Sequence, residues 1–99
     1  MTYECRLDVF DDAERARYGA LRAAMKAGTT GTHALPDGYA VRLKTDATLF
    51  QQAAEWITLE RRCCPFLDLG LEWSAADAVS VRLTGGPDVK AYLAGTFDR

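Results

Sequence analysis

Apolar and polar residues alternate in four short stretches of the chain, and this period of two predicts β-strands. Alternation places the apolar side chains of a strand on one face and the polar side chains on the other. The four predicted strands cover residues 3–9, 39–43, 67–73 and 79–83. Only a short connection separates the last two, so we expect them to form an antiparallel hairpin with one apolar face.

A first helix is predicted between the first two strands. Asp11 and Glu14 have the spacing of a capping box, in which each side chain accepts a hydrogen bond from the backbone N–H of the other residue. Gly28 is expected to end this helix. Residues 28–38 are rich in glycine and threonine and contain Pro36, a composition that predicts a loop.

A second helix, over about residues 47–63, has the strongest apolar periodicity of the chain. Asp46 is its predicted cap. Pro65 is expected to end it, because the residue before a proline avoids helical dihedral angles. A third and shorter helix is predicted over 89–97, after Pro87, since proline suits the first position of a helix.

This order of elements, β-α-β-α-β-β-α, predicts an α+β fold. Every predicted strand is amphipathic, whereas the strands of a parallel sheet covered on both faces are apolar throughout. We therefore expect a two-layer sandwich, with a mainly antiparallel sheet of three to four strands and helices on one face. The stretch β-α-β-β-α makes up much of a ferredoxin-like split motif. The length of the chain predicts a single domain over residues 1–99.

Composition and charge argue against several classes of function. Of the 99 residues, 48% are hydrophobic and 26% are charged, a globular balance that argues against intrinsic disorder. The 12 lysine and arginine residues and 14 acidic residues give a net charge of −2, so we expect no direct nucleic-acid binding. We see neither the ~20 apolar residues that a membrane span needs nor a signal peptide, which predicts a cytoplasmic protein that does not enter membranes.

The candidate chemistry lies in three cysteines, Cys5, Cys63 and Cys64. An odd number of cysteines without a secretion signal argues against a disulfide framework. A bond between the two adjacent cysteines would also close a strained ring. We therefore expect free thiols. The lack of a C-x-x-C motif argues against a thioredoxin-like site and against a zinc ribbon.

The second helix brings an acidic residue close to the cysteine pair. Glu60 precedes Cys63 by three residues and Cys64 by four, so the three side chains neighbour one another on one helix face. Trp56 lies one turn earlier on the same face, and we therefore expect Glu60 to be partly buried. Because a buried carboxylate is costly unless it is paired or protonated, an arginine or a bound cation is expected to meet it.

Two thiols at the end of a helix can chelate a soft cation, since thiolates select copper(I), zinc, mercury(II) or cadmium over hard ions. The tight bite of adjacent cysteines favours an ion of low coordination number over a tetrahedral structural zinc. The predicted metal ligands are Cys63, Cys64, Glu60 and, if its strand lies beside this helix end, Cys5. His33 is a weaker candidate. The helix macrodipole opposes this interpretation, because it disfavours a thiolate at the C-terminus.

Two other interpretations stay open on the residues alone. Free cysteine is among the most buried residue types, so Cys63 and Cys64 can be packing groups of a non-enzymatic interaction domain or homodimerisation domain. Thiol or redox chemistry is less favoured, because a nucleophile needs a base nearby and the single histidine, His33, lies in a predicted loop. The residues thus favour a non-enzymatic protein and leave the enzyme question undecided.

Residues 60–66, with the sequence E-R-R-C-C-P-F, precede an alternating strand, and L-T-G-G-P follows at 83–87. Over about residues 35–97 the chain resembles a group of small bacterial CCPF-motif proteins of uncharacterised function. Similar E-x-x-C-C-P-F segments occur as C-terminal extensions of heavy-metal MerR-type regulators. The resemblance implies a stand-alone relative of a metal-linked accessory module, and it carries over Glu60, Cys63 and Cys64. The chain lacks a winged-helix segment, so the resemblance does not extend to transcriptional regulation.

Overall fold

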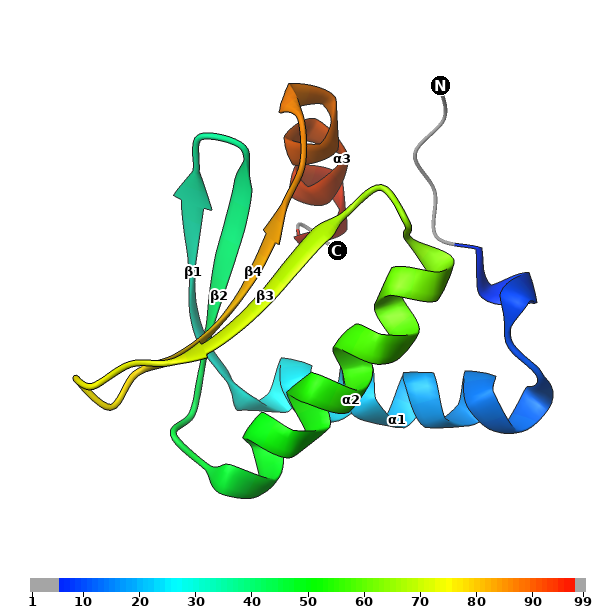
Figure 1. The fold of residues 1–99 in the computed structure, drawn as a ribbon, viewed down its shortest axis with the longest axis horizontal. Helices are drawn as coiled ribbons and strands as arrows, with labels where there is room; N and C mark the ends of the chain where they lie inside the picture. The colour runs from blue at the N-terminus through cyan, green and yellow to red at the C-terminus, as the bar shows by residue number, and fades with distance from the viewer. Residues whose placement is uncertain (1–5, 98–99) are drawn as a thin grey trace.

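The computed structural model describes residues 6–97 (Figure 1). Within this range two antiparallel hairpins, each preceded by a helix, are followed by a last helix. The elements in chain order are η1 (Leu7–Val9, a turn of 3₁₀-helix), α1 (Asp12–Gly28), β1 (Thr29–Leu35), β2 (Gly38–Leu43), α2 (Ala47–Cys63), β3 (Asp68–Trp73), β4 (Val79–Thr84) and α3 (Pro87–Phe97). The predicted α+β class is confirmed, with helices that pack on an antiparallel sheet.

The four strands form one sheet in the order β1-β2-β4-β3, and every pair of neighbours is antiparallel. Strand β4 therefore lies between β2 and β3, which run parallel to each other and are connected by α2. This arrangement is a split βαβ motif, which the order of elements in the sequence indicated without its strand order. In register, Val81 of β4 lies opposite both Val41 of β2 and Leu71 of β3, so the central row of the sheet is apolar.

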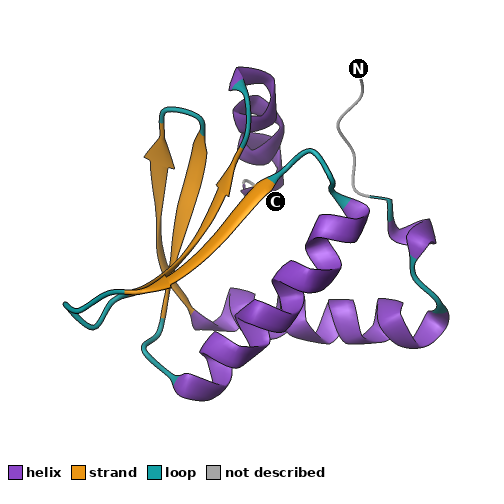
Figure 2. Ribbon diagram, in the orientation of Figure 1, coloured by secondary structure: helices purple, strands orange, loops and turns teal. Residues whose placement is uncertain are grey.

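The core lies on one face of this sheet. The buried side chains of the two central strands alternate along the chain and comprise Val41, Leu43, Val79, Val81 and Leu83. Arg42 and Arg82 lie between them in the sequence and are exposed on the opposite face. Figure 2 shows the two long helices on one side of the sheet. From α3, Val89 and Leu93 join the same apolar cluster, so all three helices contribute to one core.

Ion pairs hold α1 alongside α2, and this contact positions the site. Arg17 of α1 donates hydrogen bonds of 2.8 and 2.7 Å to the carboxylate of Glu55 in α2. Arg62, in the last turn of α2, donates a hydrogen bond of 2.5 Å to Glu14 in the first turn of α1. The Arg62 guanidinium also lies 5.2 Å from the ring centroid of Phe10. Exposed pairs contribute little individually, yet together they bring the end of α2 against the start of α1.

The predicted helix starts and stops are confirmed. Asp11 and Glu14 form the capping box of α1, and the Asp46 side chain accepts a hydrogen bond of 2.8 Å from the backbone N–H of Leu49. Helix α2 ends at Cys63, two residues before the proline. None of the described helices combines the length and the apolar character that crossing a membrane would require.

The strand predicted over residues 3–9 is wrong for its described part. Residues 1–5 lie outside the described residues, and Leu7–Val9 form the 3₁₀ turn η1. The alternation here does not reflect a buried face, because Leu7 and Val9 are 40% and 41% exposed. A backbone hydrogen bond instead connects the start of this turn to the end of α2: the N–H of Arg6 donates to the carbonyl oxygen of Cys63 over 2.9 Å.

The loop predicted over residues 28–38 is also wrong, since most of it is the edge strand β1. The predicted turn at Pro36 does connect two segments, but both of them are strands, and Leu35 pairs with Gly38. Six of the seven β1 residues are uncharged and one is His33, and most of their side chains are exposed. An edge strand with little buried surface shows no apolar alternation, so the sequence pattern did not reveal it.

The start of β2 is packed so closely that only glycine fits. A Cβ atom added at Gly38 would lie 2.0 Å from the carbonyl oxygen of Leu83 and 2.8 Å from the Cα of Thr84, both of which are backbone atoms. We expect Gly38→Ala to lower the free energy of unfolding by about 1–3 kcal/mol, because the two strands must separate. Urea denaturation measures this change.

The matched control for this prediction is Gly19→Ala in α1. A Cβ atom at Gly19 would meet nothing within 4 Å. Alanine is the better helix former, so this substitution should raise stability by roughly 0.5–1 kcal/mol. Equal effects of the two substitutions would contradict the close approach of β2 and β4 at Gly38.

Candidate functional site

The end of α2 presents the three predicted residues on its buried side. Glu60 and Cys63 belong to the last turn of the helix, and both are buried. Cys64 is the residue that caps the helix, and its backbone N–H donates a hydrogen bond of 2.7 Å to the carbonyl oxygen of Glu60. The turn therefore closes one residue before Pro65, which cannot extend the helix. The backbone thus fixes the spacing of the three side chains.

The Glu60 carboxylate is met by a tyrosine of α1. The hydroxyl of Tyr18 donates a hydrogen bond of 2.5 Å to Oε2 of Glu60, and each residue is 5% exposed. Burial raises the pKa of the Glu60 carboxyl, while the Tyr18 hydrogen bond and the positive charge of Arg22 oppose this rise. Burial also raises the pKa of the Tyr18 hydroxyl, which therefore stays a proton donor.

Cys63 lies against this pair and is fully buried. Its Sγ atom lies 3.5 Å from the backbone carbonyl oxygen of Glu60 and 3.9 Å from Oε2 of the same residue. Burial, and after it the negative charge of Glu60, raises the pKa of the Cys63 thiol to about 11. Cys63 is therefore a thiol rather than a thiolate at neutral pH, which agrees with its place at a helix C-terminus.

The two adjacent cysteines differ in state. Cys64 is disulfide-bonded, whereas Cys63 is a free thiol. Their sulfur atoms are 3.7 Å apart, far beyond the ~2.05 Å of an S–S bond, so they are not bonded to each other. The prediction of free thiols is therefore wrong for Cys64, because it rested on the cellular compartment and not on which sulfur atoms the fold brings together. Cys5 lies outside the described residues.

The described residues contain one cluster of side chains able to hold a metal ion, and it consists of the three predicted residues Glu60, Cys63 and Cys64. One ligand atom from each lies within 4.8 Å of the other two. His33, the weaker candidate, lies on β1 at the sheet edge opposite β3 and is not part of this cluster. A carboxylate with two sulfur atoms is a donor set that suits borderline and soft cations.

Sequence reasoning missed the partner of Glu60. An arginine or a bound cation was expected. Arg61 is exposed and Arg62 binds Glu14, while Arg22 acts on the Glu60 carboxyl through its positive charge. The partner is Tyr18, which is separated from Glu60 by 42 positions in the sequence. Tyr18 lies on the buried side of α1 together with Leu21, and a polar group in an otherwise apolar stripe was the signal available for it.

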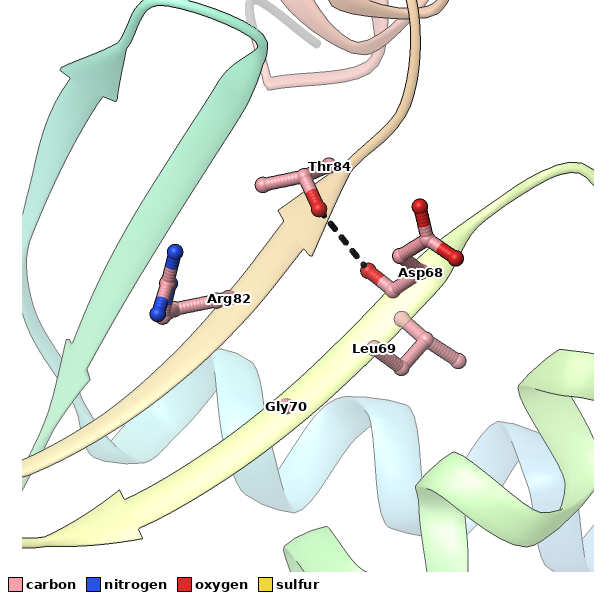
Figure 3. A pocket seen from close by; sticks show the side chains of 5 residues that line it. All are labelled: Asp68, Leu69, Gly70, Arg82 and Thr84. Atoms are coloured by element: carbon pink, nitrogen blue, oxygen red, sulfur yellow. Dashed lines mark hydrogen bonds between the residues drawn. The ribbon is translucent and has the colours of Figure 1, made fainter.

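The opposite face of the sheet carries a shallow hollow of about 230 Å³ beside β3 and β4 (Figure 3). Its lining residues are Asp68, Leu69, Gly70, Arg82 and Thr84. The hydroxyl of Thr84 already donates a hydrogen bond of 3.5 Å to the carbonyl oxygen of Asp68. Figure 3 shows the Arg82 guanidinium and the Asp68 carboxylate pointing away from each other. These groups do not converge on a common point, so the hollow adds no candidate to the site.

The raised pKa of Glu60 predicts how stability depends on pH. The folded protein holds the Glu60 proton more tightly than the unfolded chain does. In the unfolded chain this carboxyl has its ordinary pKa of 4.5. The resulting stabilisation is complete below that value and is lost as the pH rises through the pKa of the folded state. We expect Glu60→Gln, which stays uncharged, to abolish this loss in urea denaturation between about pH 3 and 8.

Glu55→Gln is the control of opposite sign. The hydrogen bond from Arg17 lowers the pKa of Glu55 below its ordinary value of 4.5. This carboxylate therefore stabilises the fold above pH 4.5 and loses that effect as the pH falls through the pKa of the folded state. Glu55→Gln should therefore flatten the acid side of the profile and leave the neutral side unchanged. Profiles of the two variants that change in the same direction would contradict the assignment of the Glu60 carboxyl.

Comparison with known proteins does not supply a function for this site. No protein-family model matches the chain, and neither the curated proteins nor the solved structures include a significant match. The function proposed below therefore rests on the chemistry of Glu60, Cys63 and Cys64, together with the hydrogen bond from Tyr18.

Proposed function

We propose that the protein is a small non-enzymatic module that binds a soft metal or metalloid ion through Cys63, Cys64 and Glu60. The observation that carries the proposal is the convergence of three ligand atoms within 4.8 Å at the end of α2. Thiolates bind thiophilic ions such as zinc, cadmium, copper(I) and mercury(II). The resemblance to CCPF-motif proteins and to extensions of metal-responsive regulators supports the same role. Cys5 is a further candidate ligand from the sequence.

The disulfide on Cys64 makes binding conditional on the redox state. A sulfur atom in a disulfide has no thiolate to offer, so the ion is bound by the reduced protein. We place the protein in the cytoplasm, where thiol reductants keep most cysteines reduced. An oxidised molecule would lose one of its three described ligands. Metal binding and disulfide formation at Cys64 therefore compete with each other.

Burial of the site sets the cost of binding. Cys63 and Cys64 are both 0% exposed, so an ion reaches them only when the end of α2 opens locally. The Cys63 thiol is protonated at neutral pH, and a metal that binds it must displace that proton. Both features favour an ion that binds sulfur strongly and is then shielded from solvent.

Native mass spectrometry of the reduced protein tests this proposal. Zinc, cadmium, copper(I) and mercury(II) are offered one at a time in competition with a small thiol. We expect the wild type to retain one ion and the double variant Cys63→Ser/Cys64→Ser to retain none, because the serine hydroxyl is a poor ligand for these ions. The control His33→Ala removes the only imidazole of the chain and should retain the ion.

The opposite result would contradict the proposal. If the reduced wild type retains none of the four ions, and Cys63 reacts with a thiol reagent only after denaturation, the cysteines are packing groups. A buried cysteine that only packs should cost about 1–2 kcal/mol of stability when it is changed to alanine. Circular dichroism of the serine variant shows whether its fold survives.

A second candidate function is a homodimerisation or other protein-interaction domain with structural cysteines, and strand β1 favours it. Edge strands offer unpaired backbone groups, and most proteins protect them with charged residues or proline. Strand β3 at the other edge carries Asp68 and Glu72, whereas β1 has neither lysine, arginine, an acidic residue nor proline. Antiparallel pairing of two β1 strands centred on Thr32 would place two threonines opposite each other without any like charges.

The substitution Thr32→Lys tests this second candidate. A lysine at the centre of β1 would bring two like charges together, so the variant should be a monomer while the wild type is a dimer. Thr58→Lys on the exposed side of α2 is the matched control and should leave the dimer intact. Sedimentation velocity at tens of micromolar measures the mass. A monomeric wild type would rule out association through β1.

A further inference from the structure

The distances within the cluster bear on the coordination geometry of the bound ion, an inference that rests on the proposed metal-binding function. Two sulfur ligands at about 2.3 Å from one ion are about 3.8 Å apart at a tetrahedral angle and about 4.6 Å apart in a linear arrangement. The Sγ atoms of Cys63 and Cys64 are 3.7 Å apart. The separation thus matches the tetrahedral edge and falls short of the linear one by almost 1 Å.

The carboxylate lies close to the position at which the same geometry requires an oxygen. A sulfur at about 2.3 Å and an oxygen at about 2.0 Å from a tetrahedral ion are about 3.5 Å apart. Oε2 of Glu60 is 3.9 Å from Sγ of Cys63, so a small rotation of either side chain closes the difference. Zinc accepts carboxylate oxygen together with sulfur, whereas copper(I) and mercury(II) favour sulfur alone.

Charge favours a divalent ion over a monovalent ion such as copper(I). Two thiolates and one carboxylate bring three negative charges into a site whose three residues are all buried. A divalent cation leaves one of these charges uncompensated and a monovalent cation leaves two, and uncompensated charge is costly in the interior. The hydrogen bond from Tyr18 holds the carboxylate in place without adding charge.

We infer that the reduced site selects a four-coordinate divalent d¹⁰ cation of the zinc and cadmium class over ions that prefer two sulfur ligands in line. Glu60 is the third ligand, Tyr18 is a positioning residue that orients it, and the fourth position falls to a group that the described residues do not supply. This four-coordinate geometry replaces the low coordination number that the tight bite of adjacent cysteines led us to expect. The backbone N–H of Cys64 donates to the carbonyl oxygen of Glu60 and is not part of the disulfide, so the helix end that carries the three residues does not depend on the disulfide for this hydrogen bond.

Cobalt(II) substitution tests the inference on the whole chain. A trialkylphosphine and water first reduce the Cys64 disulfide to two thiols, and the phosphine is oxidised to its oxide. One equivalent of cobalt(II) should then give the intense visible d–d bands of tetrahedral coordination together with a thiolate charge-transfer band. Equimolar zinc should abolish both. Tyr18→Phe should keep the bands and weaken binding about tenfold, because an outer partner of a ligand is lost.

Two failures of this experiment have different meanings. If the reduced wild type retains no ion of any kind, the proposed function itself fails. If it retains mercury(II) or copper(I) through the cysteines but gives only the weak bands of octahedral cobalt, and Glu60→Gln binds as tightly as the wild type, the metal site stands and the tetrahedral assignment is wrong. Glu60→Gln should otherwise abolish the tetrahedral bands, and urea denaturation of that variant verifies that it folds.

Discussion

The hydrogen bond between Tyr18 and Glu60 joins the two long helices inside the molecule. A carboxylate at this depth would be costly without a partner, and a hydrogen bond to a charged group contributes about 1.5–3 kcal/mol. The bond also constrains the fold, because α1 must cross α2 where its tyrosine reaches the last turn of α2. The ion pairs of Arg17 and Arg62 at the surface fix the same crossing from outside.

The chemistry at the end of α2 depends on this contact. Tyr18 and Cys63 both contact Oε2 of Glu60. Burial raises the pKa of the Cys63 thiol, and the carboxylate that the tyrosine orients raises it further. Burial keeps the thiol protonated at neutral pH, which argues against a nucleophile. In the proposed metal site the thiol would lose its proton to the ion. The redox state of Cys64 then decides whether the second sulfur is available.

Local signals made most of the fold predictable from the sequence. The capping residues Asp11 and Asp46 marked the starts of both long helices, and the alternation around Val81 identified the hairpin of β3 and β4. The spacing of Glu60, Cys63 and Cys64 placed the candidate site, since three residues within one helical turn share a face. In each case the information lies within a few neighbouring residues.

Features that depend on distant contacts were not predictable in this way. Strand β1 has almost no buried surface, so only its pairing with β2 makes it a strand. Tyr18 is 42 positions from Glu60, and no local pattern connects them. The oxidation state of Cys64 likewise depends on which sulfur atoms the fold brings together and not on the count of cysteines.

We propose that Cys63, Cys64 and Glu60 jointly bind a metal ion when the protein is reduced. X-ray absorption at the zinc edge of the reduced, zinc-loaded protein tests it most directly, because it measures the ligand atoms themselves. We expect at least two sulfur ligands at about 2.3 Å and oxygen at about 2.0 Å, with sulfur lost in Cys63→Ser/Cys64→Ser. A shell of oxygen and nitrogen alone, identical in the wild type and the variant, would contradict it.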